Sequence, residues 1–361
     1  MKYRQRRPTS TEFLLVVECC RRSFAGGDAE PVHELARTAR WDDVLHLSRR
    51  HRVQGLVRHC LRTLEIEPPP AVATSLSDDT NAIARLNLLA TRKSAELLQT
   101  FGRAGIPLLF IKGLTLAALA YPHPYLKMSR DIDVLVPGDA IPAAATQLQA
   151  LGYRLVTPAV SADSARFRRW HGKRKESVWQ SADGSYLELH SRLADSRDLI
   201  GGIGVGSPRQ DVEIAPGNVL PTLARDELLA YLCVHGASSA WFRLKWITDL
   251  AALLHGCPPE EIERLYDWSQ QLGAGRAAAQ ALLLAARVFG TAQGSELERR
   301  LGQDRVNRWL ADAAWRQMTR REEPTQSRFG TATIHLSQLF LLPGMRFALR
   351  ELARQIAAAV P

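Results

Sequence analysis

Two carboxylates stand at the head of an apolar, β-branched run of the sequence, Ser129-Arg130-Asp131-Ile132-Asp133-Val134-Leu135-Val136. Residues i and i+2 of a strand project to the same face, so Asp131 and Asp133 should point one way while the apolar residues pack on the other. Two like charges held this close are costly unless a cation lies between them. A hard divalent ion such as Mg²⁺, bound against the phosphates of a nucleotide, would supply that cation. The same pair also occurs at solvated strand starts, and this alternative stays open.

A third carboxylate falls on a later apolar stretch, Tyr186-Leu187-Glu188-Leu189-His190. The leucines alternate with Glu188 and His190, so the two polar side chains should share one face of a strand. Because an unpaired buried carboxylate is costly, Glu188 is either a third metal ligand or an exposed residue of a half-solvated sheet. His190 could bind phosphate, orient the carboxylate or be a packed structural histidine.

Basic residues occur at two places that could contact phosphate. Lys112 precedes Gly113 in a turn after an apolar run, where its charge could act on a β- or γ-phosphate or be that of an ordinary turn lysine. The densest basic stretch runs from Arg166 to Lys175. This stretch either binds an anionic group, of the triphosphate or of an acidic acceptor, or is a solvated charged run.

A further polar group, His235, Arg243, Lys245 and Asp249, lies on or near one expected helix. Lys245 and Asp249 are one helical turn apart, so the fold should bring them together. The group could pack a helical domain over the nucleotide, or it could be an internal set of salt bridges.

The elements that must position these residues begin with helices. Residues from about 10 to 104 have a helical pattern, with an N-terminal cap at 9–11. Apolar residues recur at near-helical spacing over 41–64, three prolines at 68–70 break the chain, and a long helix is expected over 79–104. This part reads as an N-terminal helical module.

The periodicity changes after 105. The expected order is strand, helix, strand, helix, strand and hairpin, with strands near 108–111, 131–136, 153–156, 176–180 and 185–189. From Leu223 the pattern is helical again, with a helix opening at Pro259, an exposed loop over 322–330 and a last helix around 343–360. We therefore expect a helical module over 1–105, a catalytic mixed α/β core over 106–220 and a helical domain over 221–361.

Composition restricts the class of protein. The chain has 361 residues, 46% of them hydrophobic, which is enough for one large or two ordinary domains with real cores. The formal charge of +10 favours polyanionic partners, although direct nucleic-acid binding is possible rather than favoured because the excess is spread along the chain. No apolar stretch is long enough to span a bilayer, and the basic start Met1 to Pro8 is not followed by a signal-peptide pattern. Five scattered cysteines should be reduced, mostly buried thiols, and we expect a cytoplasmic protein.

Four blocks in order resemble a bacterial family of uncharacterised nucleotidyltransferases within the DNA polymerase β-like superfamily. The blocks are Phe110-Ile111-Lys112-Gly113, Ser129 to Val136, Leu187-Glu188-Leu189-His190, and His235-Gly236-Ala237 continuing through Trp241 to Asp249. The resemblance covers roughly residues 30–290. It differs from better-known members of the superfamily in its turn, which is Lys112-Gly113 and lies farther from Asp131.

The resemblance implies an α+β fold, with a polymerase β-like core around a small mixed sheet and helical modules on either side. It implies a two-metal site in which Asp131, Asp133 and Glu188 bind Mg²⁺ and carry catalysis. The donor would be a nucleoside triphosphate, with ATP expected. The residues assigned to nucleotide binding are Lys112, Gly113, Arg130, His190, Arg243 and Lys245.

The resemblance also implies transfer of a nucleotidyl group to a hydroxyl, with release of pyrophosphate. The acceptor could be a protein, a peptide, a small molecule or an RNA end. Phosphoryl transfer on the same metal site is a second possibility, because carboxylate-bound metals and basic clamps serve both reactions. A third is a catalytically silent partner-binding protein, such as an antitoxin or scaffold, that keeps the fold.

Overall fold

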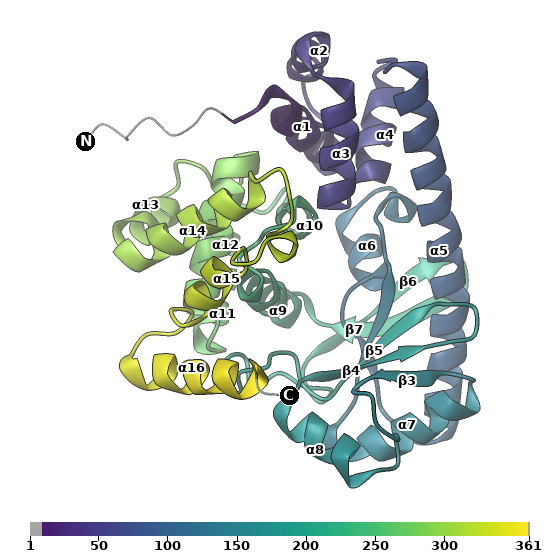
Figure 1. Cartoon of the computed structure of the whole chain (residues 1–361). Coiled ribbons are helices and arrows are strands. Elements are labelled where there is room, and N and C mark those ends of the chain that lie inside the picture. Colours follow the sequence, from purple (N-terminus) through teal and green to yellow (C-terminus); the bar gives the residue numbers. More distant parts are fainter. Residues whose placement is uncertain (1–8, 360–361) are drawn as a thin grey trace.

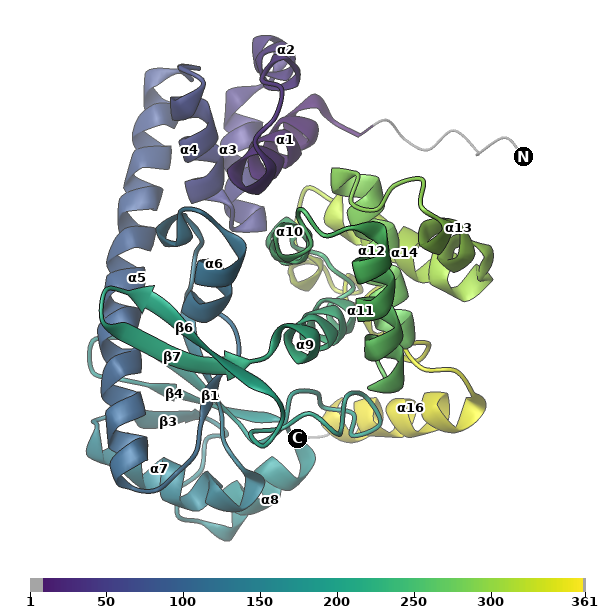
Figure 2. The same cartoon turned by 180° about the vertical axis from the view of Figure 1, so that it is seen from behind.

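The computed structural model describes residues 9–359. Met1 to Pro8, the basic start of the sequence, and residues 360–361, which include the end of the last expected helix, lie outside the described residues. Figures 1 and 2 show three groups of elements. They are N-terminal helices in purple to blue, a sheet-containing group in blue to teal, and C-terminal helices in green to yellow.

The first group is helical, as predicted. Its helices are α1 (Thr11–Ala25), α2 (Glu30–Thr38), α3 (Trp41–His51), α4 (Gln54–Thr63) and α5 (Pro70–Arg103). Ser10 caps α1, because its hydroxyl accepts a hydrogen bond from the backbone N–H of Phe13 at 3.2 Å.

Two boundaries in this group differ from the prediction. The pattern over 41–64 forms two helices, and Arg52, in a left-handed conformation with φ 58°, ends α3. The long helix α5 begins at Pro70 rather than at residue 79. The proline run does not separate the chain from this helix, because a proline fits the first helical turn, where its missing N–H has no intrahelical partner.

The second group carries a five-stranded sheet. Its elements are β1 (Leu109–Phe110), α6 (Leu114–Ala120), η1 (Pro124–Leu126), β2 (Asp131–Leu135), η2 (Gly138–Ala140), α7 (Ile141–Ala150), β3 (Arg154–Thr157), α8 (Ala165–Lys173), β4 (Glu176–Gln180) and β5 (Tyr186–His190). The strand order is β1-β2-β5-β4-β3. Strands β2 and β5 are parallel and the other neighbours are antiparallel, so the small mixed sheet of the α+β prediction is confirmed.

One face of this sheet is apolar and is covered by helices. Ile132, Val134, Leu187, Leu189 and Trp179 form a buried cluster there with side chains from α5, α7 and α8. Figure 1 shows α7 and α8 below the sheet and α5 along its side. The alternation of the strands then turns the polar residues of β2 and β5 to the opposite face.

Two elements in this region were not predicted. The strands β6 (Arg209–Ala215) and β7 (Asn218–Leu223) form a separate hairpin. Val212 and Ile214 alternate with charged residues in β6, but this pattern is short, and Pro221 lies inside β7, where a proline argues against a strand. The basic stretch contains helix α8, whose Phe167 packs on the sheet.

The third group is helical, as predicted. Its elements are α9 (Arg225–Ser238), α10 (Leu244–Leu253), α11 (Pro259–Gln271), α12 (Gly275–Phe289), α13 (Glu296–Gln303), α14 (Arg305–Met318), η3 (Pro324–Gln326), α15 (Ala332–Gln338) and α16 (Met345–Ala359). Helix α11 begins at Pro259, the predicted start. The loop over 322–330 is mostly exposed, as predicted, although Pro324 and Gly330 are buried.

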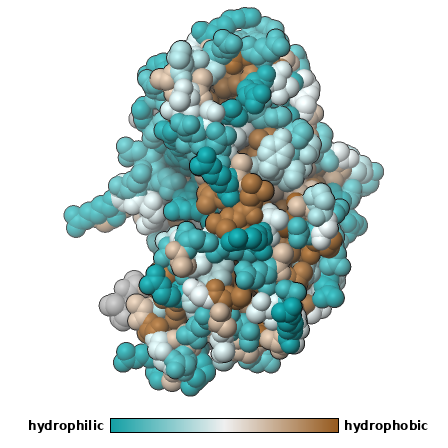
Figure 3. Space-filling view, turned by 90° about the vertical axis from the view of Figure 1, so that its right-hand side faces the viewer, coloured by the Kyte–Doolittle hydropathy of each residue, from teal (hydrophilic) through white to brown (hydrophobic). Residues whose placement is uncertain are grey.

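One face of the molecule is mainly polar. The face in Figure 3 is hydrophilic over most of its area, with hydrophobic side chains gathered toward its middle. Within residues 9–359, no helix is both long and apolar enough to cross a membrane. All five cysteines are free; Cys257 is half-buried and the others are buried, as predicted.

Candidate active site

The parallel pairing of β2 with β5 brings three predicted site residues together. Asp133 lies directly opposite Glu188, and His190 follows two residues later on the same face. The His190 Nε2 atom lies 3.2 Å from Asp133 Oδ1 and 3.4 Å from Glu188 Oε2. One ligand atom from each residue lies within 4.8 Å of the other two. We call Asp133, Glu188 and His190 the acidic cluster.

Lys112 supplies the nearest positive charge. Its Nζ lies 2.8 Å from Asp133 Oδ1 and 3.7 Å from Glu188 Oε2. Lys112 follows β1, which pairs with β2, so the turn is held beside the acidic cluster. Gly113 has φ 70°, a conformation that glycine adopts readily, and it lets the chain enter α6 at once.

A second ion pair lies behind His190. The His190 Nδ1 atom is 3.3 Å from Glu176 Oε2, and Glu176 is itself paired with Lys175. Glu176 stands opposite His190 in the antiparallel β4–β5 pair. Glu176 was not predicted as a site residue, because its place opposite His190 depends on the register of the hairpin.

Burial and charge shift the titration of the cluster in opposite directions. Burial raises the pKa of Asp133 to about 6, against the opposing effect of Lys112. Burial alone would raise the pKa of Glu188 too, but Lys112 and His190 outweigh it and hold that pKa well below its usual range. Burial disfavours charged His190 and Lys112, yet Glu176 and Asp133 respectively keep both pKa values above their ordinary values. Each carboxylate of the cluster therefore lies beside basic side chains that pair with it.

Asp131 lies two residues before Asp133 on the same face but outside the acidic cluster. Its side chain is half-exposed, and among residues 9–359 it takes part in no hydrogen bond or ion pair. The loop before it is held by Asn87 of α5. The Asn87 amide donates to the carbonyls of Tyr125 (3.0 Å) and Lys127 (2.9 Å) and accepts from the N–H of Ser129 (3.3 Å). Arg130, assigned to the nucleotide, is exposed.

Of the further polar group, Arg243, Lys245 and Asp249 lie on or beside α10, whereas His235 lies on α9. Arg243 makes a two-pronged ion pair with Glu323, with both N–O distances 2.8 Å. Asp249 pairs with Lys127 at 3.5 Å, whereas Lys245 acts on it only through its charge. Burial and Lys127 lower the pKa of Lys245 to about 7, while Asp131 raises it. When it is protonated, Lys245 thus carries a charge that acts on Asp131.

The basic stretch meets the acidic cluster at one end only. Lys175 reaches it through Glu176. Earlier in the stretch, Arg168 and Arg169 are exposed on α8. His171 forms a hydrogen bond with the hydroxyl of Ser177 at 3.0 Å.

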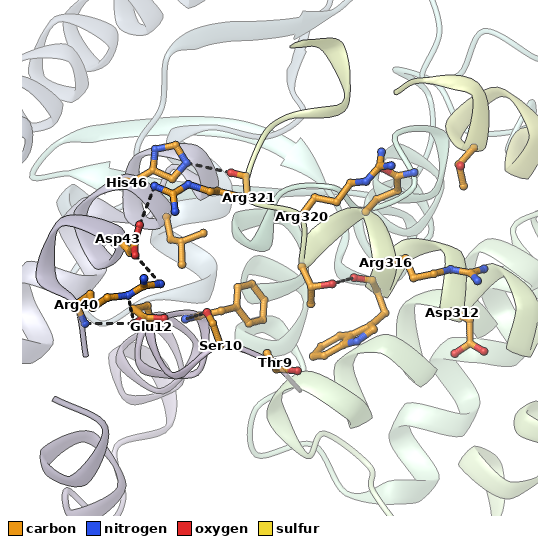
Figure 4. A pocket seen from close by; sticks show the side chains of 16 residues that line it. Thr9, Ser10, Glu12, Arg40, Asp43, His46, Asp312, Arg316, Arg320 and Arg321 are labelled. Carbon is orange, nitrogen blue, oxygen red and sulfur yellow. Dashed lines mark hydrogen bonds and ion pairs between the residues drawn. The ribbon is translucent and has the colours of Figure 1, made fainter. Parts of the chain in front are cut away.

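A large cavity lies elsewhere in the described part of the molecule. It has a volume of about 860 Å³ and separates α1 and α3 from α14 (Figure 4). Arg321 bridges its walls, pairing with Asp43 at 2.8 Å and accepting at its carbonyl a hydrogen bond from His46 at 3.0 Å. None of its lining residues belongs to the acidic cluster, so its size alone does not mark it as the place of chemistry.

The acidic cluster has the donors that a divalent ion needs. Asp133 Oδ2 is buried and, among the described residues, has no hydrogen-bond partner. A buried oxygen of this kind, beside a second carboxylate and an imidazole, fits a metal ion.

Residues 37–290 match the family described as uncharacterised nucleotidyltransferase. This chain belongs to that family. The match spans the acidic cluster, the turn at Lys112 and the α10 group, so the predicted resemblance is confirmed. A nucleotidyltransferase is a transferase, and the family implies a nucleoside triphosphate substrate and a divalent metal. No curated protein matches the chain in sequence.

Proposed function

We propose that this nucleotidyltransferase moves a nucleoside monophosphate from a nucleoside triphosphate, with ATP as the expected donor, to a hydroxyl of a protein, peptide or small molecule. The observation that carries the proposal is the meeting of Asp133, Glu188 and His190 on paired strands of a chain from this family. Asp133 Oδ2, buried and without a hydrogen-bond partner among residues 9–359, supports a role in ligand binding rather than in folding alone.

The residues divide into two sets. Asp131, Asp133 and Glu188 would hold the divalent ions, of which two are expected. Bound Mg²⁺ would lower the pKa of the acceptor hydroxyl and neutralise the charge of the triphosphate. Lys112, Gly113, Arg130, His190, Arg243 and Lys245 are the proposed contacts of the nucleotide.

In the reaction, the acceptor oxygen forms a bond to the α-phosphorus. The bond between that phosphorus and the oxygen of the β-phosphate breaks, and pyrophosphate leaves. Glu188 or Asp133 takes the proton of the hydroxyl. Lys112 stands closest to both carboxylates and could move its charge to a β- or γ-phosphate when the triphosphate binds.

Intact mass tests the proposal directly. The full chain is incubated with the four triphosphates, Mg²⁺ and candidate acceptors, and the masses of the protein and of the acceptors are measured. A gain of one nucleotidyl unit supports the proposal. A gain of phosphate alone would show phosphoryl transfer instead, and the absence of triphosphate binding in calorimetry would favour a silent partner-binding protein.

Two variants make the test specific. Asp131→Asn and Glu188→Gln remove a ligand charge but little volume, so each should lose the product while its circular dichroism stays that of the wild type. Full activity in either variant would rule out the assigned role of that carboxylate.

A further inference from the structure

We propose that His190 is a direct ligand of the ion held by Asp133 and Glu188, so that this position selects a divalent first-row transition metal ion such as Mn²⁺ over Mg²⁺. The inference rests on the proposed function, because it concerns the metal of the same site. It replaces the role of His190 as a phosphate contact.

The spacing of the donor atoms carries the first step. A single atom, His190 Nε2, is hydrogen-bonded to an oxygen of Asp133 at 3.2 Å and lies 3.4 Å from an oxygen of Glu188. Two ligands at right angles around an ion with bonds of about 2.1 Å are about 3 Å apart. The imidazole nitrogen therefore stands where a neighbouring ligand of the same ion would stand.

Glu176 carries the second step. Its Oε2 lies 3.3 Å from the other ring nitrogen, Nδ1, an ion-pair distance, although Nδ1 makes no hydrogen bond among residues 9–359. Histidines that bind metals in proteins commonly face a carboxylate with their second nitrogen, and Glu176 is the carboxylate in that position here. Lys175, paired with Glu176, keeps this carboxylate in place.

The rigidity of the ring carries the third step. His190 is 0% exposed and lies between β2 and β4, in register with Leu135 on one side and Glu176 on the other. A ring so enclosed cannot turn away toward solvent.

Lys112 approaches the same two carboxylates and competes with an ion for them.

The chemistry of the donors gives the selectivity. Mg²⁺ prefers oxygen ligands in a strict octahedron and dehydrates reluctantly. Imidazole nitrogen favours first-row transition ions, and carboxylates accept Mn²⁺ as readily as Mg²⁺. Two carboxylates and one imidazole should therefore bind Mn²⁺ at least about tenfold more tightly than Mg²⁺.

Pulsed electron paramagnetic resonance of Mn²⁺ bound to the full chain, without nucleotide, tests the inference. We expect a coupling from one directly bound nitrogen, altered when histidine is labelled with ¹⁵N. His190→Gln puts an amide in place of the ring nitrogen, so the coupling should disappear and the preference for Mn²⁺ over Mg²⁺ should fall by about tenfold. His255→Gln removes an exposed imidazole outside the site and should keep the coupling.

Each other outcome decides the inference. Bound Mn²⁺ without nitrogen coupling in the wild type overturns it and leaves the proposed nucleotidyl transfer standing, to be judged by product mass. Binding of neither ion overturns both. If His190→Gln does not fold, the wild-type spectrum still decides, and Glu176→Gln should weaken Mn²⁺ binding more than Mg²⁺ binding; an unchanged ratio would count against the inference.

Discussion

Asp133 on β2 and Asp249 on α10 are both almost fully buried, with 2% and 3% of the residue exposed. Asp249 uses both oxygens: Oδ1 accepts a hydrogen bond from Tyr121 at 2.8 Å, and Oδ2 pairs with Lys127 at 3.5 Å. Asp133 receives Lys112 and His190 on Oδ1 alone, and its Oδ2 has no hydrogen-bond partner within residues 9–359.

The difference teaches how to tell a structural charge from a functional one. Asp249 is satisfied within the fold and joins α10 to the segment that precedes β2. Asp133 is crowded by the like charges of Glu188 and Asp131 and keeps one oxygen free. Burial raises the pKa of both carboxyls, so the shift in pKa alone would not have separated them.

The largest expected effect is on metal binding. Asp133→Asn removes a ligand charge and should weaken Mn²⁺ affinity, measured by calorimetry, by more than about 100-fold. Asp249→Asn is the matched control, because it removes a carboxylate of equal burial outside the acidic cluster, and its affinity should stay within about threefold of the wild type. Equal losses in both variants would erase the distinction between the two aspartates.

The next effect is on stability, where Asp249→Asn should cost more than Asp133→Asn. Asp249→Asn leaves the buried ammonium of Lys127 without its ion pair, which should lower the free energy of unfolding by about 3 kcal/mol. Asp133→Asn should cost less than half of that, because Lys112 keeps Glu188 and one of several crowded negative charges is gone. Urea unfolding in the presence of a chelator measures both, and a larger loss in Asp133→Asn would contradict the comparison.

The pH dependence of stability sharpens the comparison of Asp133 with Asp249. Since the folded state raises the pKa of Asp133 from 3.8 to about 6, it binds this proton more tightly than the unfolded state does. The resulting stabilisation is fully present below pH 3.8 and is lost as the pH rises through about 6. Without metal, the free energy of unfolding of the wild type should fall by up to about 3 kcal/mol relative to that of Asp133→Asn between these limits. A flat difference across this range would show that burial does not act on Asp133 in this way.

The smallest effects concern the basic stretch. Lys175→Met removes the partner of Glu176 behind His190 and should weaken Mn²⁺ binding by about tenfold. Arg169→Ala, on the exposed surface of α8, should change it by less than about twofold. A strong loss of triphosphate affinity in Arg169→Ala would instead show that the basic stretch binds the triphosphate. Calorimetric titration with Mn²⁺ and with the triphosphate measures both effects.

Sequence reasoning located the acidic residues because alternation along a strand is a local rule. It placed Glu188 and His190 on one face and Asp131 with Asp133 on another strand, and the structure brings Asp133, Glu188 and His190 together. What the sequence could not supply was the partner of each charge. The pairing of Lys127 with Asp249 joins residues far apart in the chain, and it depends on how α10 packs.

The missed elements have similar causes. The hairpin β6–β7 has only a short alternation in β6 and a proline inside β7, so its pattern is too weak to read. Asn87 gave no signal, because a single amide on a long helix has no pattern, yet it holds the loop before Asp131. The register of parallel strands, which decides that Asp133 faces Glu188, is likewise set by tertiary packing.

Helix α5 has a consequence for how the chain can be divided. Its 34 residues extend about 51 Å and contact both the N-terminal helices and the sheet. Leu97 and Phe101 cover the apolar side of the strands, while Asn87 holds the loop that precedes Asp131. A fragment that started at β1 would lose all three at once. Any portable catalytic piece of this protein must therefore be cut before Pro70, and the sheet can be exchanged between proteins only with its helix attached.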